Sequence, residues 1–479
     1  MNIDLRLDGA ARRGVGEGIE AAAAALRAVE SGALDPTRAR VVGDWVQYKQ
    51  NFREPVMARP VLGHKEEELE LAFDLRRADA SLLDGQIAAA LAIDDSEAAW
   101  LEDFGPVSRS VLWRFNALYW GELALWEEAS GRAYAQTLPG GESAATKSEA
   151  ARAVVLELFR VFDALAERRA LPEHLTVLEI GVGNGEQARV WLEEFRRADA
   201  EHGREYYRRL QYLMADYSTH VLDLARQTVA EHRDKVSTLA LDAAHPRETL
   251  RFLDGEVFFV YISNVYDNLP TDELACLDGE LHQVEVRAHL PGADVRALAE
   301  TLGMEPHWVE GLVARLVTLG PRLLSQTMPS VFADAAAATT FWREVWSRLR
   351  LAERYRPLGP LDRYLLCEEL TGELIEPLTA GQGDVRFHAS NGAVSSFLDT
   401  LPLLNPYGFL TCHDLFVTDL AQYRSAFRGP GKYDGSVVNW VNGPVLSAAA
   451  SRRGYHVTFE PFAHGSRSPI VTAVARARD

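Results

Sequence analysis

The chain has few cysteines, no long apolar run and a deficit of basic residues. Its three cysteines, Cys276, Cys367 and Cys412, are scattered over 479 residues without a CxxC pair. This spacing argues against both a disulfide framework and a zinc site, so we expect no metal. The longest apolar runs, such as residues 87–93, fall far short of the ~20 residues that a membrane helix requires. We therefore expect no membrane partner.

The charge balance is strongly acidic. Against 50 lysine and arginine residues stand 69 aspartate and glutamate residues, which gives a formal net charge of −19. Such a surface repels polyanions, so we expect no nucleic-acid partner. The first residues, MNIDLRLDGAARRG, lack the apolar segment of a signal peptide. This predicts a cytoplasmic location, and the abundance of alanine and arginine favours a bacterial source.

The most informative stretch is LTVLEIGVGNG, residues 175–185. Residues 176–180 read as a buried parallel strand, because the run is too short for a helix and is bounded by glycines. The glycines let the backbone turn tightly and approach a ligand closely. A helix predicted to begin near Glu186 would point its first N–H groups at the crevice beside the strand ends. The loop consists of an acidic residue followed by three glycines: Glu179, Gly181, Gly183 and Gly185.

The spacing of this loop narrows the choice of fold. Rossmann dehydrogenases space their glycines G-x-G-x-x-G, whereas this chain has G-x-G-x-G with an acidic residue two places before the first glycine. The pattern resembles motif I of class I S-adenosylmethionine-dependent methyltransferases. The resemblance implies that S-adenosyl-L-methionine is the cofactor, and that Glu179 and the glycines wrap its aminocarboxypropyl and adenosine groups.

Two further strand ends fit the same resemblance in order. Residues 210–215 and 237–241 read as the second and third strands. A carboxylate can accept two hydrogen bonds from a vicinal diol, and the resemblance implies that Asp216 binds the ribose hydroxyls. It also implies that Asp242 and the N–H of Ala243 contact the adenine. The cofactor residues at these two ends are Asp216, Tyr217, Asp242 and Ala243. An aspartate in such a place is also a common helix N-cap.

The fourth predicted strand, residues 257–263, is nearly all apolar and leads into Asn264. In the family this strand end lies under the methyl group, which places Asn264 in the cofactor site. Methyl transfer is an in-line displacement at a sulfonium, so the enzyme aligns a nucleophile and removes a proton when the acceptor is an O–H or acidic C–H group. Tyr266 and Asp267 follow directly and are candidates for orienting an amine acceptor.

A fifth strand is predicted over residues 409–417, after the Pro-x-Gly turn at residues 406–408. His413 in this strand is our preferred general base. Imidazole titrates near neutral pH, and Asp414 follows it closely. The alternative is that His413 only packs against the end of the sheet.

The C-terminal segment predicts a hairpin. Residues 455–460 and 469–474 read as two strands joined at the turn 464–467, which is too short for a parallel crossover. A mostly parallel sheet with an antiparallel C-terminal hairpin resembles the seven-stranded sheet of class I methyltransferases. The predicted fold class is therefore α/β, with a doubly wound, mostly parallel, seven-stranded Rossmann-like sheet formed by residues 151–280 and 381–479.

The remaining segments are predicted to be helical. Residues 1–150, which include the charged segment 65–78 and the aromatic segment 111–120, read mainly as helices of a lid, substrate or dimerisation domain. Residues 281–380 read as a helical insertion between the fourth and fifth strands, with a helix-turn-helix-like pair around Gly303. Its charges suit phosphate contact poorly, which favours a structural or lid role over DNA reading. These helical regions also offer surfaces for a homodimer.

From about residue 140 onward the chain also resembles the MidA-like family, whose mitochondrial member is an arginine methyltransferase assisting complex I assembly. The run SNVYDNLP, residues 263–270, stands where that family has an Asn-Glu-x-x-Asp-Ala-Leu-Pro-like run. Val182 departs from the usual proline or alanine, and Val265 replaces the acidic residue. The resemblance therefore carries over the fold and the cofactor but not the arginine substrate.

We predict a methyltransferase acting on an O, N or C nucleophile of a small-molecule acceptor, such as a natural product, or of a peptide acceptor. The predicted helical lids would enclose this acceptor. Two alternatives stay open. One is a protein or peptide arginine methyltransferase of the MidA-like type, and the other is a catalytically inactive S-adenosylmethionine-binding regulator or scaffold.

Overall fold

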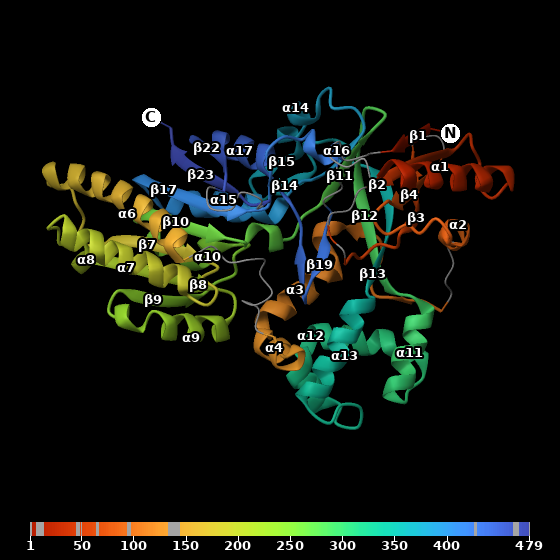
Figure 1. Ribbon diagram of the computed structural model, residues 1–479, viewed down its shortest axis with the longest axis horizontal. Helices are drawn as coiled ribbons and strands as arrows, with labels where there is room; N and C mark the ends of the chain where they lie inside the picture. The colour runs from red at the N-terminus through yellow and green to blue at the C-terminus, as the bar shows by residue number, and fades with distance from the viewer. Residues whose placement is uncertain are drawn as a thin grey trace. The chain divides into compact units, whose positions relative to one another are not determined.

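The computed structural model describes residues 2–5, 14–44, 48, 50–63, 67–92, 97–132, 144–425, 429–462 and 469–478. The chain divides into two compact units (Figure 1). Unit 1 consists of Met1–Tyr119, Pro270–Asn391 and Val417–Pro444, and unit 2 consists of Trp120–Leu269, Gly392–Phe416 and Val445–Asp479. Both units combine helices with strands, so the mixed α/β class is confirmed.

Unit 2 is built on a seven-stranded sheet with the order β22-β23-β17-β10-β7-β8-β9. Neighbours from β17 to β9 pair in parallel, whereas β23 is antiparallel to both β17 and β22. The strands are β7 (Leu175–Ile180), β8 (Leu210–Asp216), β9 (Val236–Ala240), β10 (Val257–Ser263), β17 (Leu404–Asp414), β22 (Tyr455–Pro461) and β23 (Val471–Ala477). The strands predicted for this part of the chain are therefore present, and the C-terminal hairpin is antiparallel. Its predicted turn, residues 464–467, lies outside the described residues.

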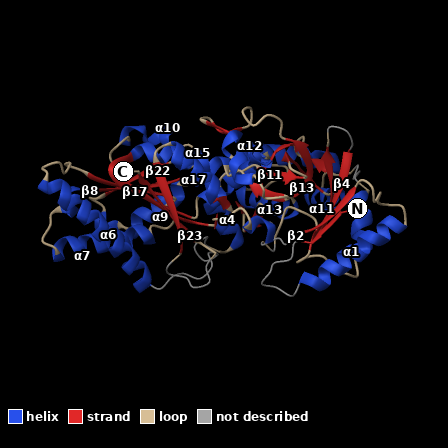
Figure 2. Cartoon of the chain, turned by 90° about the horizontal axis from the view of Figure 1, so that it is seen from above, coloured by secondary structure: helices blue, strands red, loops and turns tan. Residues whose placement is uncertain are grey.

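Helices lie on both faces of this sheet. Figure 2 shows α6 and α7 on one face and α10 and α15 on the other. The helices of unit 2 are α4 (Leu123–Ser130), α6 (Ala144–Glu167), α7 (Glu186–Glu201), α8 (Tyr206–Arg209), α9 (Thr219–Thr228), α10 (Pro246–Leu250), α15 (Asn391–Thr400) and α17 (Gly443–Arg452). Helix α7 begins at Glu186, as the glycine loop predicts.

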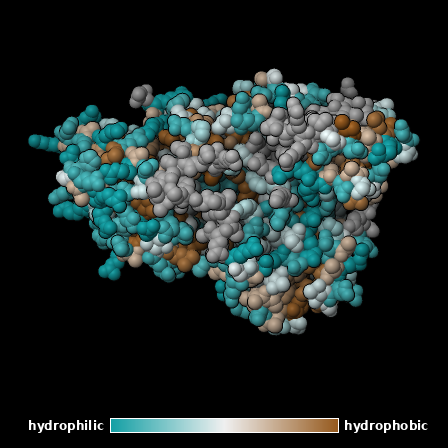
Figure 3. Space-filling model, viewed as in Figure 1, coloured by the Kyte–Doolittle hydropathy of each residue, from teal (hydrophilic) through white to brown (hydrophobic). Residues whose placement is uncertain are grey.

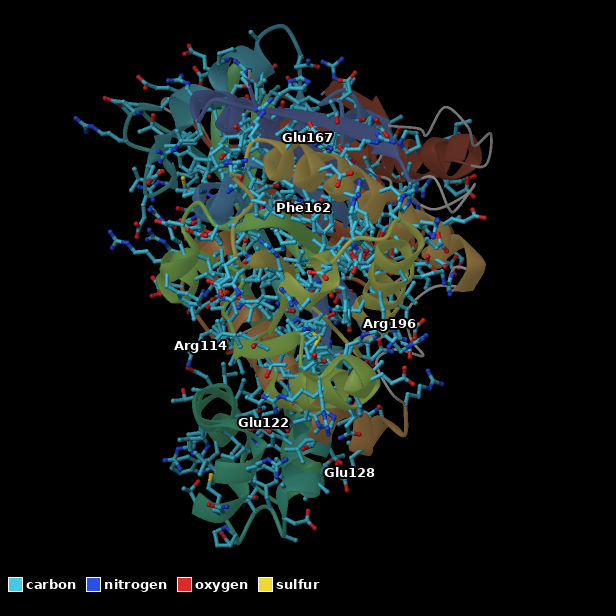
Figure 4. The ribbon with its side chains drawn as sticks, turned by 90° about the vertical axis from the view of Figure 1, so that its left-hand side faces the viewer. Arg114, Glu122, Glu128, Phe162, Glu167 and Arg196 are labelled. Carbon is cyan, nitrogen blue, oxygen red and sulfur yellow. The ribbon has the colours of Figure 1, made fainter. Side chains whose placement is uncertain are left out.

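Aromatic side chains form much of the core between this sheet and helices α6 and α7. Phe159 and Phe162 of α6 are buried, and Figure 4 shows the position of Phe162 on that helix. The ring centroid of Phe159 lies 5.0 Å from that of Phe195 on α7, and the centroid of Phe162 lies 5.1 Å from that of Phe258 on β10. Each such ring contributes ~1.5–3 kcal/mol by leaving water. This packing fixes β7 and α7, and with them the ends of the glycine loop.

Unit 1 contains a ten-stranded mixed sheet, so the prediction that residues 1–150 and 281–380 are mainly helical missed the strands in these segments. The order is β1-β2-β4-β3-β13-β12-β11-β16, and β5 and β6 also pair with β12. The strands are β1 (Asn2–Leu5), β2 (Ala39–Asp44), β3 (Val56–Leu62), β4 (Glu67–Asp74), β5 (Ala99–Trp100), β6 (Gly105–Pro106), β11 (Glu273–Leu277), β12 (Glu280–Leu290), β13 (Arg350–Pro357) and β16 (Val385–His388). The long strands β12 and β13 enclose the helical part of the predicted insertion in the sequence.

Apart from segment 65–78, the helices predicted inside these segments are present. They are α1 (Gly14–Glu30), α2 (Leu83–Leu91), α3 (Val111–Gly121), α11 (Gly292–Leu302), α12 (Val309–Thr327) and α13 (Ala335–Arg348). Helix α11 ends at Gly303 with a φ of 63°, a left-handed conformation that suits glycine at a helix end. Trp113, Phe115 and Tyr119 of α3 are buried, so the aromatic segment is core.

The charged segment 65–78 was predicted as a helix but contains strand β4. Its apolar residues Leu69, Leu71 and Phe73 recur at every second position, which is the period of a strand. Glu70 lies between them in sequence and is only 2% exposed, because an ion-pair network on the other face of the strand accommodates it. The charged residues of this segment were therefore read as the solvent-exposed side of a helix, although Glu70 is buried in a strand.

The face shown in Figure 3 is predominantly hydrophilic, with scattered hydrophobic residues. Exposed large apolar side chains include Ile19, Phe252 and Trp308. Single exposed apolar residues are normal for a folded domain. Among the helices in the described part of the chain, none has the length and apolarity that crossing a bilayer requires.

A network of buried charges lies inside unit 1. Arg53 donates a hydrogen bond of 2.8 Å to Glu273, Arg386 donates one of 2.9 Å to Glu353, and Arg59 forms a 2.9 Å ion pair with Glu353. All five side chains are at most 4% exposed. Burial alone would raise the pKa of Glu353, but the guanidinium groups around it hold this pKa well below its ordinary range.

We expect Glu353→Gln to destabilise unit 1 by ~3–5 kcal/mol, because it leaves buried guanidinium groups without their partner. The pKa of Glu353 is lower in the folded state than its unfolded value of about 4.3. Its stabilising effect is therefore present above that pH and is lost as the pH falls toward the folded pKa. Urea unfolding followed by circular dichroism measures the free energy of unfolding of wild type and variant at pH 7 and pH 3. We expect the difference between them to be smaller at pH 3. The exposed Glu300→Gln is the control, and equal stability of the two variants would contradict the prediction.

Candidate functional site

The glycine loop follows the carboxyl end of β7 and is hydrogen-bonded to the end of β8. The N–H groups of Gly181 and Val182 donate to the carbonyl of Ala215 at 2.8 and 3.2 Å. The N–H of Gly183 donates to the carboxylate of Asp216 at 3.3 Å. Two strand ends that are far apart in the sequence are thus tied together at the edge where open α/β sheets bind ligands.

The three glycines of the loop have different structural tasks. All have left-handed φ values, 77° at Gly181, 56° at Gly183 and 79° at Gly185. A β-carbon at Gly181 would collide with the side chain of Val265, and one at Gly185 would lie 2.8 Å from Cα of Ala225. A β-carbon at Gly183 would meet nothing within 4 Å. Gly181 and Gly185 therefore serve close packing, whereas Gly183 borders open space.

Two carboxyl groups lie beside the loop, that of Glu179 buried and that of Asp216 partly exposed. Glu179 is 2% exposed and accepts a 2.6 Å hydrogen bond from the hydroxyl of Tyr212. Burial raises the pKa of Glu179 to about 8, and the nearby charge of Asp216 acts in the same direction. Burial also raises the pKa of Asp216 to about 6, although the N–H groups of Ser218 and Gly183 donate to it. Both groups can therefore change protonation when a charged ligand arrives.

Tyr217 and Asp242 stand at the ends of β8 and β9. Tyr217 is 46% exposed, and its pKa is raised first by partial burial and then by the charge of Asp242. Asp242 is exposed and accepts a 2.9 Å hydrogen bond from the N–H of Ala244, which places Ala243 inside this turn. The carboxylate of Asp242 thus closes a local turn by accepting from the N–H two residues on, and it remains accessible to solvent.

The turn after β10 is held by a carboxylate from β17. Asn264 has a φ of 52°, and its N–H donates to the carbonyl of His413 at 2.9 Å. The next N–H groups converge on one carboxylate oxygen of Asp414. They belong to Val265, Tyr266 and Asp267, at 3.1, 2.8 and 3.4 Å. The turn that the sequence placed near the methyl group is therefore held by hydrogen bonds from its backbone N–H groups to Asp414.

The side chains of Tyr266 and Asp267 lie inside unit 2. Tyr266 is 1% exposed and Asp267 is 5% exposed. Burial raises the pKa of both groups well above their ordinary values, and the charge of Asp414 raises the pKa of Asp267 further. The two buried side chains pack beneath the backbone of the turn, inside unit 2, and do not reach the solvent from which an acceptor would come.

His413 is partly buried beside β23. Its Nδ1 lies 2.9 Å from Oγ1 of Thr472, and its ring packs against Tyr261 and Phe462 with centroids 5.4 and 5.1 Å away. Successive strand residues point to opposite faces, so Asp414 does not orient His413 as their adjacency suggested. Sequence reasoning named Asp414 only as the neighbour of His413 and missed its role in holding the turn after β10. The available signal was its place at the end of β17, next to the end of β10.

Replacing Glu179 by Gln tests the buried carboxyl group. Its pKa is higher in the folded state than the unfolded value of about 4.3. The wild type therefore loses stability as the pH rises from about 4.3 to about 8, by at most ~1.4 kcal/mol per pH unit. Glu179→Gln has no such titration, so we expect its stability relative to the wild type to increase between pH 5 and pH 8. Urea unfolding at both pH values measures this difference, and a constant difference would contradict it.

Comparison with known proteins agrees with the sequence motifs. A family model described as "putative S-adenosyl-L-methionine-dependent methyltransferase" matches residues 153–346, less than half of the chain. This stretch includes the glycine loop, Asp216, Asp242 and Asn264. No curated protein matches the chain.

Solved structures show only distant likeness. An uncharacterized protein from Burkholderia thailandensis is 13% identical with a TM-score of 0.45, covering 83% of this chain and 90% of its own. A protein of the same superfamily from that organism, bound to S-adenosyl-homocysteine, is 13% identical with a TM-score of 0.43, covering 83% and 91%. A 1,6-didemethyltoxoflavin-N1-methyltransferase from B. thailandensis is 10% identical with a TM-score of 0.32, covering 81% and 98%. These values are too low to assign a shared function.

The family match bears directly on the predicted cofactor and reaction class. It covers the loop, the strand ends and the turn from which both predictions were made. The prediction that this chain resembles S-adenosylmethionine-dependent methyltransferases, with S-adenosylmethionine as the cofactor, is confirmed.

Proposed function

We propose that unit 2 binds S-adenosylmethionine at the carboxyl ends of β7, β8, β9 and β10 and transfers its methyl group to an acceptor. Gly183 carries this proposal: it is left-handed, it borders open space, and its N–H is held by Asp216. The strand order with one reversed strand, β23, supports the doubly wound methyltransferase layout.

The parts of the cofactor can be assigned to the strand ends. The glycine loop and Glu179 would take the aminocarboxypropyl group, and Asp216 would accept from the ribose hydroxyls. Tyr217, Asp242 and Ala243 would border the adenine, and Asn264 would lie near the methyl group. When bound, the cofactor supplies a sulfonium-activated methyl group.

The electrostatics of this edge suit a cationic ligand. S-adenosylmethionine carries a sulfonium and an ammonium group against a single carboxylate. A nearby positive charge lowers the pKa of a carboxyl group, so binding would favour ionisation of Glu179 and Asp216. Both pKa values are raised by burial before the ligand arrives. The positive charge of the bound ligand would thus offset part of the desolvation cost of ionising these two carboxyl groups.

For the acceptor we propose an O, N or C nucleophile of a small molecule or a peptide. The net charge of −19 disfavours polyanionic acceptors. For an O–H or acidic C–H acceptor we propose His413 as the general base, with Thr472 holding its Nδ1. Tyr266 and Asp267 act in this proposal by supporting the turn, because both side chains are buried.

Binding of the cofactor is tested by isothermal titration with S-adenosylmethionine and S-adenosylhomocysteine. We expect Gly183→Asp to fill the open space and Asp216→Ala to remove a charge-assisted acceptor, each weakening affinity by at least about tenfold. Gly203→Asp is the matched control, since Gly203 also has a left-handed φ, 60°, and open space around it. Absence of binding by the wild type would refute the proposed function. Equal weakening by Gly203→Asp would show that the effect is not local.

The role of His413 is tested by its replacement with Gln, which keeps a side-chain polar group near Thr472. With an O–H or acidic C–H acceptor, we expect kcat to fall by ~10²–10⁴ because proton removal is lost. Release of S-adenosylhomocysteine is measured with small molecules, peptides and arginine-containing peptides as acceptors. An unchanged kcat with an O–H acceptor would exclude His413 as the base. Turnover confined to arginine peptides would favour the MidA-like alternative.

A further inference from the structure

The carboxylate of Asp414 is fully buried and is surrounded by backbone donors. One oxygen accepts from the three successive N–H groups of the turn after β10, at 2.8 to 3.4 Å. The other oxygen accepts from the N–H of Leu415 at 2.7 Å. A carboxylate with several N–H donors is stabilised in its charged form. Burial raises the pKa of Asp414 to about 6, and these N–H donors oppose that rise by favouring the ionised form.

The backbone N–H of Asp267 donates to Asp414 at 3.4 Å, and the carboxyl group of Asp267 is also buried; burial, then the charge of Asp414 and a side-chain interaction with it, raise its pKa well above the ordinary value. The side chain of Asn268 also donates to Asp267 at 2.7 Å. Two buried carboxylates in contact cannot both stay ionised, so the pair keeps one proton. Because the N–H donors converge on Asp414, the proton resides on Asp267, which donates it to Asp414.

The turn held by this pair packs directly against the glycine loop. The side chain of Val265 occupies the space that a β-carbon on Gly181 would need. Gly181 is itself fixed by its hydrogen bond to Ala215 at the end of β8. A shift of the turn would therefore move Val265 relative to Gly181 and disturb the close contact between them.

We propose that Asp267 and Asp414 form a proton-sharing pair that positions the turn at residues 264–267 against the glycine loop, and so sets affinity for the methionine end of the cofactor. Both are positioning residues that act through the backbone. The part concerning affinity rests on the proposed function, whereas the positioning of the turn does not.

Hydrogen exchange on the ligand-free full-length protein tests the positioning directly. Asp414→Asn removes the negative charge and replaces one of two accepting oxygens by an NH2 donor, so we expect exchange of the peptide covering residues 264–268 to accelerate at least tenfold. Asp267→Asn keeps a donor toward Asp414, and we expect less than threefold acceleration. Asp223→Asn, on the exposed surface of α9 (side chain 63% exposed), is the matched control. Wild-type exchange rates in Asp414→Asn would overturn the proposal.

Two further measurements keep the proposal testable if Asp414→Asn does not fold. The infrared difference between the wild type and Asp267→Asn at pH 7 should contain the C=O stretch of a protonated carboxyl group, and its absence would overturn proton sharing. Titration with S-adenosylhomocysteine should show at least tenfold weaker binding in Asp414→Asn and a smaller loss in Asp267→Asn. Faster exchange in Asp414→Asn without binding by the wild type would refute the proposed function but retain the positioning. Equal losses of affinity in Asp414→Asn and Asp267→Asn would contradict the expectation that Asp414, which accepts from the N–H groups of the turn, matters more to the turn than Asp267.

Discussion

The loss of water around carboxyl groups is the constraint on which the carboxyl edge of the unit 2 sheet depends. Glu179, Asp216, Asp267 and Asp414 all have pKa values raised by burial. An ionised carboxyl group away from water is costly unless donors replace its hydration. For Asp216 and Asp414 the replacements are backbone N–H groups of the loops that follow the strands, whereas Glu179 accepts from the Tyr212 hydroxyl and Asp267 from the Asn268 amide. The conformations of the glycine loop and of the turn after β10 are therefore consequences of where the carboxyl groups lie.

Unit 1 meets the same constraint in a different way. Glu353 is as deeply buried as these groups, but guanidinium groups surround it and its pKa is lowered. The direction of the shift follows from the partner: full positive charges in unit 1, and dipoles with a tyrosine hydroxyl around the unit 2 carboxyl groups. A site whose carboxyl groups are satisfied by dipoles alone still gains from a cation. This difference explains why the unit 2 edge suits a cationic cofactor and the unit 1 network suits a structural role.

The parts of the fold that sequence patterns predicted are those in which neighbours along the chain share an environment. Strand β7 is buried on both faces and reads as a continuous apolar run, and its glycines follow immediately. Strand β13 alternates Leu351, Glu353 and Tyr355 on its buried side, so its pattern depends on arginines from distant segments. No local pattern reports such partners. The same limit applies to Asp414: its neighbour His413 lies on the opposite face, while its real partners are about 150 residues away.

Val265, which stands where the MidA-like pattern has an acidic residue, suits this geometry. The side chain at this position packs against Gly181, and the N–H of the same residue donates to Asp414. An acidic side chain here would bring another carboxyl group to an edge that already contains Glu179, Asp216, Asp267 and Asp414. Like charges in a poorly solvated region repel strongly. The added repulsion would raise the pKa of the carboxyl group that has the fewest hydrogen-bond donors. Valine fills this space without adding a charge, so its side chain packs against the glycine loop while the hydrogen bonds to Asp414 hold the backbone of the turn.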